Sequence, residues 1–194
     1  ALLRELQKAD QLAMARAEGD LKHPAIVQAR RDAAVVALLL HAGLRVGELV
    51  ALEIGDVEVS ERKGQVMVRY GKGGKQRPVP LNTDARKAVN DWLEVRQQGG
   101  SDHLFLGKSG KHLSKRGVQY LVRKYAKAAK LDGCSPHTLR HTFGKSLLDA
   151  GVGLEQVATL MGHESLETTM IYITPSAQDL ANAIEQVAWS DSTK

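Results

Sequence analysis

Two arginines far apart in the chain have the character needed to bind a phosphodiester under attack. Arg45 stands in the stretch HAGLRVGEL, and Arg140 stands in SPHTLRHTFG. Guanidiniums stay charged at any working pH, and their forked donors match phosphate oxygens. They could meet the charge that develops on the two non-bridging oxygens, which is the work of magnesium in other phosphoryl-transfer enzymes. We therefore expect a site that needs neither a metal nor another cofactor.

A tyrosine downstream supplies a candidate nucleophile for the same reaction. Tyr172 ends the stretch LMGHESLETTMIY. Its phenol has an ordinary pKa of about 10, so only roughly one molecule in a thousand is ionised at neutral pH and the site must help it. His137 is the candidate base, because it lies three residues before Arg140 and shares a helical face with it. His163 would donate a hydrogen bond to a non-bridging oxygen, and Lys72, in GKGGKQ, would protonate the leaving oxygen.

The stretch HTLRH also has the spacing of a zinc-binding helix, since His137 and His141 are four residues apart. A zincin carries a glutamate directly after the first histidine and needs a third ligand. This chain has Thr138 where that glutamate would stand. The pattern therefore disfavours a metal site, and we interpret His141 as a histidine that packs or forms hydrogen bonds locally.

The elements that must position these residues are mostly helical. Apolar residues recur at helical spacing over residues 1–18 and 25–43, and a short helix should begin near Arg45. Between 57 and 81 the stretches VEVS, QVMVRY and RPVPL alternate apolar with polar residues and are separated by glycine-containing turns, which predicts three antiparallel strands. Helical spacing then returns near 83–98, 114–130, 136–150, 154–161, 166–173 and 176–188. The predicted fold class is mainly α with a small three-stranded antiparallel sheet.

Composition sets the broad class of the protein. The chain has 194 residues, 43% of them hydrophobic, which suits one sizeable globular domain. The longest apolar run, AAVVALLL, is too short to cross a bilayer, and the first residues form no signal peptide. We therefore expect a cytoplasmic protein without a membrane partner. Cys134 is the single cysteine, which excludes an intrachain disulfide, and the formal charge of +5 favours a polyanionic partner.

In chain order these residues read Arg, Lys, His-x-x-Arg, His and Tyr, with a glycine before the second histidine. This order closely resembles the catalytic domain of the tyrosine recombinases, also called the phage integrase family, and the resemblance covers nearly the whole chain. It implies the DNA breaking-rejoining fold, double-stranded DNA as partner, and cleavage that leaves a 3′-phosphotyrosine and a free 5′-hydroxyl. It also implies a homotetramer on DNA that is weakly associated or monomeric without it. The catalytic residues that it implies are Arg45, Lys72, His137, Arg140, His163 and Tyr172. Gly144 replaces the usual alanine after LRHTF, a departure that concerns packing more than chemistry.

Three further charged residues have two interpretations each. Glu48 is either a solvated helix charge or, three residues past Arg45, the group that holds its guanidinium; we favour the second. Lys75 and Arg77 flank the lysine-bearing hairpin. Either they bind backbone phosphates of the DNA or they solvate the edge of a strand.

We expect residues 1–175 to form the catalytic domain and 176–194 to form a C-terminal helix and tail. The resemblance implies that this helix docks on a neighbouring protomer. The resemblance implies a separate helical domain ahead of the catalytic one, and we expect that domain to be absent here, which would make the chain either an excised catalytic fragment or an unusually short family member. Two alternatives remain on the same scaffold: a type IB topoisomerase and a catalytically silent DNA-binding protein. The contexts GLR, HTLRH and GH favour the recombinase.

Overall fold

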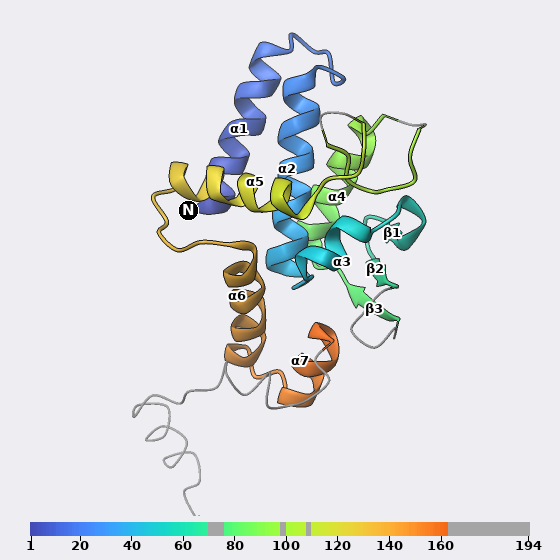
Figure 1. Cartoon of the computed structure of the whole chain (residues 1–194), viewed down its shortest axis with the longest axis vertical. Coiled ribbons are helices and arrows are strands. Elements are labelled where there is room, and N and C mark those ends of the chain that lie inside the picture. The colour runs from blue at the N-terminus through green and yellow to red at the C-terminus, as the bar shows by residue number, and fades with distance from the viewer. Residues whose placement is uncertain (70–75, 98–99, 108–109, 163–194) are drawn as a thin grey trace, which may run out of the picture.

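Helices dominate the computed structural model, which describes residues 1–69, 76–97, 100–107 and 110–162 (Figure 1). The sheet is small and lies on one side of the helices. This arrangement confirms the predicted fold class. The helices are α1 (Leu2–Arg16), α2 (Pro24–His41), α3 (Val46–Ala51), α4 (Thr83–Val95), α5 (Lys115–Ala128), α6 (Pro136–Asp149) and α7 (Leu154–Met161). The strands are β1 (Val57–Val59), β2 (Gly64–Val68) and β3 (Arg77–Pro80), and a 3-10 turn, Ile54–Asp56, precedes β1.

Helix α2 is the centre of the main core. Its apolar run from Ala34 to Leu39 is buried on all sides, because α1, α4 and α6 pack around it. Figure 1 shows α1 alongside α2 and α5 crossing in front of it. In the part of the chain that the structure describes, no helix is both long and apolar enough to span a bilayer.

A buried polar contact ties α2 to α5. Asp32 is 2% exposed and accepts hydrogen bonds from the Arg31 guanidinium at 2.7 Å and from the Tyr125 hydroxyl at 3.2 Å. Burial raises the pKa of Asp32, although the neighbouring charge and hydrogen bonds of Arg31 act in the opposite direction. The carboxyl of Asp32 is therefore hydrogen-bonded within the protein and shielded from solvent.

The sheet is antiparallel with the order β1-β2-β3. The register pairs Val66 with Val79 and Val68 with Arg77. The three valines are buried against the helices. This register fixes the backbone of Arg77 at the first residue of β3, where the strand leaves the hairpin.

Helices α6 and α7 enclose a second, smaller apolar cluster that is separate from the main core. Val157 and Met161 of α7 are fully buried in it, against Phe143 and Leu147 of α6. Helix α7 ends at Gly162, whose φ of +63° is the left-handed conformation that favours glycine at a helix end. Figure 1 shows α6 and α7 at the end of the molecule opposite the α1–α2 turn.

The helix ends follow local chemistry. Side chains of Asn82, Ser114 and Ser135 accept backbone hydrogen bonds and so begin α4, α5 and α6. Helix α4 stops at Val95, three residues short of its predicted end, because Arg96 turns inward. Its guanidinium donates to the carbonyls of the following loop, those of Gln97, Ser101, His103 and Leu104. The helices predicted at 166–173 and 176–188 lie outside the described residues.

Candidate active site

The first turn of α3 brings Arg45 and Glu48 together. The backbone N–H of Arg45 donates to Oε2 of Glu48, and its Nη1 donates to Oε1, both at 2.8 Å. The Glu48 side chain is 3% exposed, whereas 35% of the Arg45 side chain is exposed. Glu48 thus caps its own helix and orients the Arg45 guanidinium with the same carboxylate.

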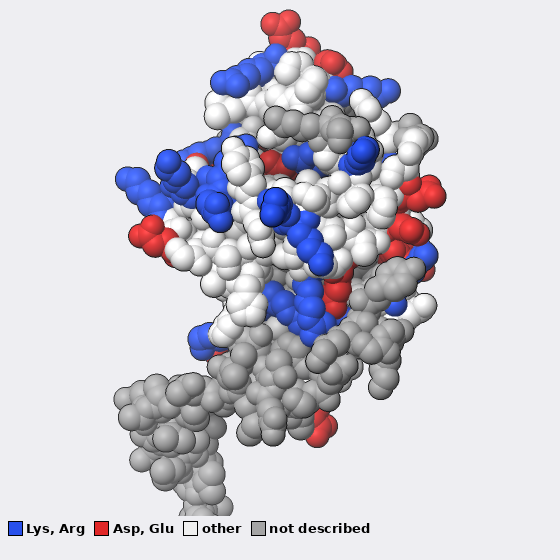
Figure 2. All heavy atoms as spheres, viewed as in Figure 1, with Lys and Arg blue, Asp and Glu red and all other residues white. Residues whose placement is uncertain are grey.

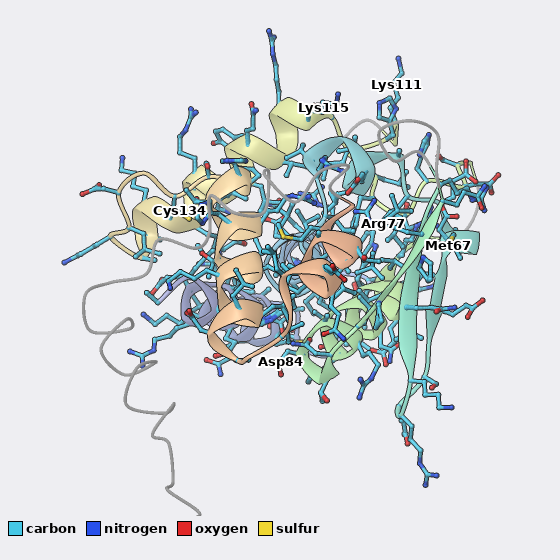
Figure 3. All side chains as sticks on the ribbon, turned by 90° about the horizontal axis from the view of Figure 1, so that it is seen from below. Met67, Arg77, Asp84, Lys111, Lys115 and Cys134 are labelled. Carbon is cyan, nitrogen blue, oxygen red and sulfur yellow. The ribbon has the colours of Figure 1, made fainter. Side chains whose placement is uncertain are left out.

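Arg77 reaches the same carboxylate from the sheet. Its Nη1 and Nη2 each donate to one oxygen of Glu48 at 3.0 Å, which is the bidentate geometry of a strong arginine–carboxylate pair. Its Nε donates to the carbonyl of Leu160 at 3.1 Å. Only 13% of this side chain is exposed. In Figure 3 the labelled Arg77 lies between the orange α7 and the strands.

Arg140 approaches from α6 and is almost entirely buried, with a side chain that is 6% exposed. Its Nη1 donates to the carbonyl of Gly43, and its Nη2 donates to the carbonyl of Met161 at 2.6 Å. Nη1 also lies 3.9 Å from Oε2 of Glu48. A hydrogen-bonded arginine at this depth has a fixed position before any ligand arrives.

Three guanidiniums therefore surround one buried carboxylate. Burial would raise the pKa of Glu48, but hydrogen bonds from Arg77 and Arg45 outweigh it and hold that pKa below its ordinary value. The carboxylate supplies one negative charge against three positive ones. The excess positive charge is what an anionic ligand such as a phosphate would neutralise.

The carboxyl end of α7 completes the frame. Leu160, Met161 and Gly162 are consecutive, and their carbonyls accept from Arg77, Arg140 and Arg45 respectively, the last at 2.9 Å. The last carbonyls of a helix have no partner within the helix and carry a partial negative charge. These three main-chain groups thus hold three arginines that come from three different elements.

His137 lies in the first turn of α6, one turn before Arg140, and is exposed. Its ring meets that of His141 edge-on, with 6.4 Å between the centroids. Within the described ranges no three His, Cys, Asp or Glu side chains are grouped so that they could hold a metal ion. His137 is thus on the same helix as Arg140, and its side chain is accessible to solvent.

The remaining predicted site residues, Lys72, Lys75, His163 and Tyr172, lie outside the described residues. The described neighbours of two of them are fixed, however. Arg77, the first residue of β3, follows Lys72 by five positions, and Gly162 directly precedes His163.

Comparison with known proteins gives the family. Residues 16–179 match the description of the phage integrase family, which is most of the chain. The chain belongs to the phage integrase family. Over 159 residues it is 41% identical to the tyrosine recombinase XerC of Corynebacterium efficiens, a match that covers 81% of this chain and 50% of that relative. The chain thus spans about half the length of the relative it matches.

Two solved structures share the phage integrase fold. The XerA recombinase is 29% identical, with a TM-score of 0.73 over 95% of this chain and 64% of the other. The XerH site-specific recombinase, solved bound to its difH substrate, is 24% identical, with a TM-score of 0.73 over 97% of this chain and 53% of the other. The second likeness shows the fold alone.

One role in this phage integrase domain was not predicted from the sequence. The sequence allows Arg77 to be a phosphate contact or a solvated strand-edge residue, whereas its guanidinium faces Glu48 and α7. The signal that could have found it is the alternation in RPVP, which places Arg77 on the same face of its strand as buried Val79. A charge on the buried face of a strand requires a buried partner.

Proposed function

We propose that this chain is the catalytic part of a site-specific DNA recombinase that cleaves and rejoins DNA through a 3′-phosphotyrosine intermediate on Tyr172. The observation that carries the proposal is the convergence of Arg45 and Arg140 on Glu48 and on the end of α7. Both guanidiniums are oriented in advance, so little reorganisation is needed when charge develops on a phosphate between them.

In this reaction the Tyr172 oxygen attacks phosphorus, and the bond from phosphorus to the 5′-oxygen breaks. His137 takes the phenolic proton, and Lys72 gives a proton to the departing 5′-oxygen. Arg45, Arg140 and His163 donate to the non-bridging oxygens. Rejoining is the reverse, with a 5′-hydroxyl attacking the phosphotyrosine. The number of phosphodiester bonds is conserved, so the exchange needs no nucleotide as a source of energy.

The surface beside the site supports double-stranded DNA as the partner. Figure 2 shows Lys and Arg side chains gathered over α5 on the viewed face. The exposed basic residues of this helix are Lys115, Arg116, Arg123, Lys124 and Lys127. Such a row suits the phosphates of a duplex that also reaches Arg45. Strand exchange between two duplexes requires four active sites, and we therefore propose a homotetramer on DNA.

The test is formation of a covalent adduct. A duplex selected by its binding to the protein is nicked next to the cleavage point and incubated with the protein in EDTA. Wild type should form a 3′-linked adduct, Tyr172→Phe should form none, and Tyr120→Phe, which alters a tyrosine that is 71% exposed on α5, should match wild type. An adduct in Tyr172→Phe, or one that requires magnesium, contradicts the proposal.

A second measurement separates recombination from topoisomerase chemistry. With two intact duplexes, a recombinase should yield Holliday junctions. Relaxation of supercoiled DNA without any junctions would assign the chain to the type IB topoisomerase class instead. An intact fold that binds DNA and never forms an adduct would assign it to silent DNA-binding proteins.

A further inference from the structure

Arg77 directs each of its three guanidinium nitrogens into the protein. Nη1 and Nη2 bind the two oxygens of Glu48, and Nε binds the Leu160 carbonyl. Arg45 differs, because its side chain donates from Nη1 and Nη2 and about a third of that side chain remains exposed, at 35% against 13% for Arg77. The two arginines share one carboxylate but face in different directions: Arg45 partly toward solvent, Arg77 toward the interior.

Arg77 also joins α7 to two elements of the main core, β3 and α3. Its backbone lies in β3, its Nη1 and Nη2 bind the buried Glu48 of α3, and its Nε binds the Leu160 carbonyl in the last turn of α7. The apolar contacts of α7 lie in the small cluster with α6, apart from the main core. Polar bonds to the arginines therefore tie the end of α7 to the sheet and to α3.

Gly162 shows how closely Arg77 is packed at this junction. A Cβ added at residue 162 would lie 2.6 Å from Cζ of Arg77, well inside any real contact distance. Residue 162 also has a φ of +63°. The glycine that precedes His163 is thus required by the guanidinium that lies against it as well as by its own backbone conformation.

We propose that Arg77 is a positioning residue for the cleavage reaction: through Glu48 and the end of α7 it sets the orientation of Arg45 and Arg140 without contacting the DNA. The inference rests on the proposed function and adds a role that the nucleophile and the two phosphate-binding arginines do not fill. A lysine cannot replace Arg77, because a single ammonium cannot bind both oxygens of Glu48 and the Leu160 carbonyl as a planar guanidinium does.

A DNA contact and a positioning role predict different measurements. A residue that binds a backbone phosphate contributes to the affinity and to its salt dependence, so its loss reduces the slope of log K against log salt by about 1. A residue that only orients the catalytic arginines changes the rate of the chemical step and leaves both binding quantities unchanged.

The test compares Arg77→Lys with Arg69→Lys. Arg69 is the matched control, since it stands at the end of the neighbouring strand and pairs with Glu53 and Asp56 instead of Glu48. Arg77→Lys should lower the single-turnover cleavage rate about 10- to 100-fold, the usual cost of misplacing a catalytic group by a fraction of an ångström to an ångström. Arg69→Lys should stay within about threefold of wild type. Because lysine keeps the positive charge, DNA binding is measured with Arg77→Gln, which should keep the wild-type affinity and salt slope.

A double variant tests whether Arg77 acts through Glu48. If it does, adding Arg77→Gln to Glu48→Gln should slow cleavage less than Arg77→Gln slows it in the wild-type background. The pH profile gives an independent readout. Loss of Arg77 removes a hydrogen bond that lowers the pKa of Glu48, so the Glu48 carboxylate should become protonated at a higher pH. As pH is lowered, cleavage by Arg77→Gln should therefore begin to decline at a higher pH than cleavage by wild type.

The outcomes separate this inference from the proposed function. Absence of an adduct with wild-type protein refutes the proposed function, and the inference falls with it. An adduct with wild type, together with Arg77→Lys cleavage within about threefold of wild type, refutes the positioning role alone. A reduced salt slope in Arg77→Gln makes Arg77 a DNA contact and likewise refutes the positioning role. Thermal melting of each variant identifies a loss of rate that comes from unfolding.

Discussion

Gly43 is the position where one added methyl group should disturb the arginine frame most. Its φ is +60°, and a Cβ there would lie 2.2 Å from Cδ1 and 2.7 Å from Cε1 of Phe143. Its carbonyl accepts a hydrogen bond from Arg140, which stands one turn before Phe143 on α6. Gly43→Ala therefore pushes α6 away at the residue whose carbonyl must hold Arg140.

The expected loss of stability in Gly43→Ala has two contributions. A non-glycine residue in the left-handed region costs about 1–2 kcal/mol. Overpacking against a ring in a cluster that is already filled costs about 1–3 kcal/mol more. Gly133→Ala is the matched control, because Gly133 has a φ of +68° with nothing within 4 Å of an added Cβ. It should show the first cost alone, so Gly43→Ala should be the more destabilising by about 1–3 kcal/mol.

The assay is urea unfolding followed by far-UV circular dichroism, with equal slopes required before midpoints are compared. Gly43→Ala combined with Phe143→Leu should recover part of the lost stability, since the smaller side chain removes the ring from the Cβ. Cleavage by Gly43→Ala should also slow under conditions where the variant is fully folded. Equal destabilisation by the two glycine variants would show that the Phe143 ring yields without cost, and the reasoning would be wrong.

Three further predictions concern other parts of the chain. Because burial raises the pKa of Asp32, its contribution to the free energy of unfolding should fall as pH rises from the ordinary carboxyl range through that raised pKa. In urea unfolding, the stability of Asp32→Asn relative to wild type should therefore increase over this pH interval. A stability difference that stays constant with pH contradicts the account. Lys72→Ala should slow cleavage about 10²- to 10⁴-fold and recover on a 5′-bridging phosphorothiolate, whereas Arg45→Ala should stay slow there; equal rescue would leave Lys72 no acid role. Truncation after Pro175 should reduce recombination more than the melting temperature, and unchanged recombination would remove the trans-docking role.

Much of the fold follows from periodicity. The run around Ala34 and Leu39 is apolar on every face, which only a central helix such as α2 satisfies. Boundaries follow where a side chain caps locally, as Ser135 does for α6. The end of α4 could not be predicted, because Arg96 leaves the helical path to bind carbonyls whose positions depend on the folded loop.

The contacts of the site likewise include some that the sequence predicts and others that it does not. The pairing of Arg45 with Glu48 is predictable, because both lie in one turn of α3. The bond from Arg77 to Glu48 joins a strand to a helix, and that from Arg140 to Gly43 joins α6 to the distant loop between α2 and α3. Such contacts depend on the packing of whole elements, which local spacing does not encode. Residue types indicated the chemistry, while tertiary structure decided which arginine faces outward.

Several of the acceptors that hold the arginines are main-chain oxygens, which side-chain substitutions do not remove. Main-chain oxygens of Gly43, Leu160, Met161 and Gly162 receive the guanidinium protons, and an alanine scan leaves every one of those oxygens in place. Such a scan would therefore undervalue the end of α7, whereas replacing single amides by esters would expose it. Inserting or deleting one residue within α7, ahead of Leu160, would rotate these carbonyls by about 100° relative to the rest of the helix. At Leu160 and Met161 the chain is accordingly constrained in its length more than in its composition.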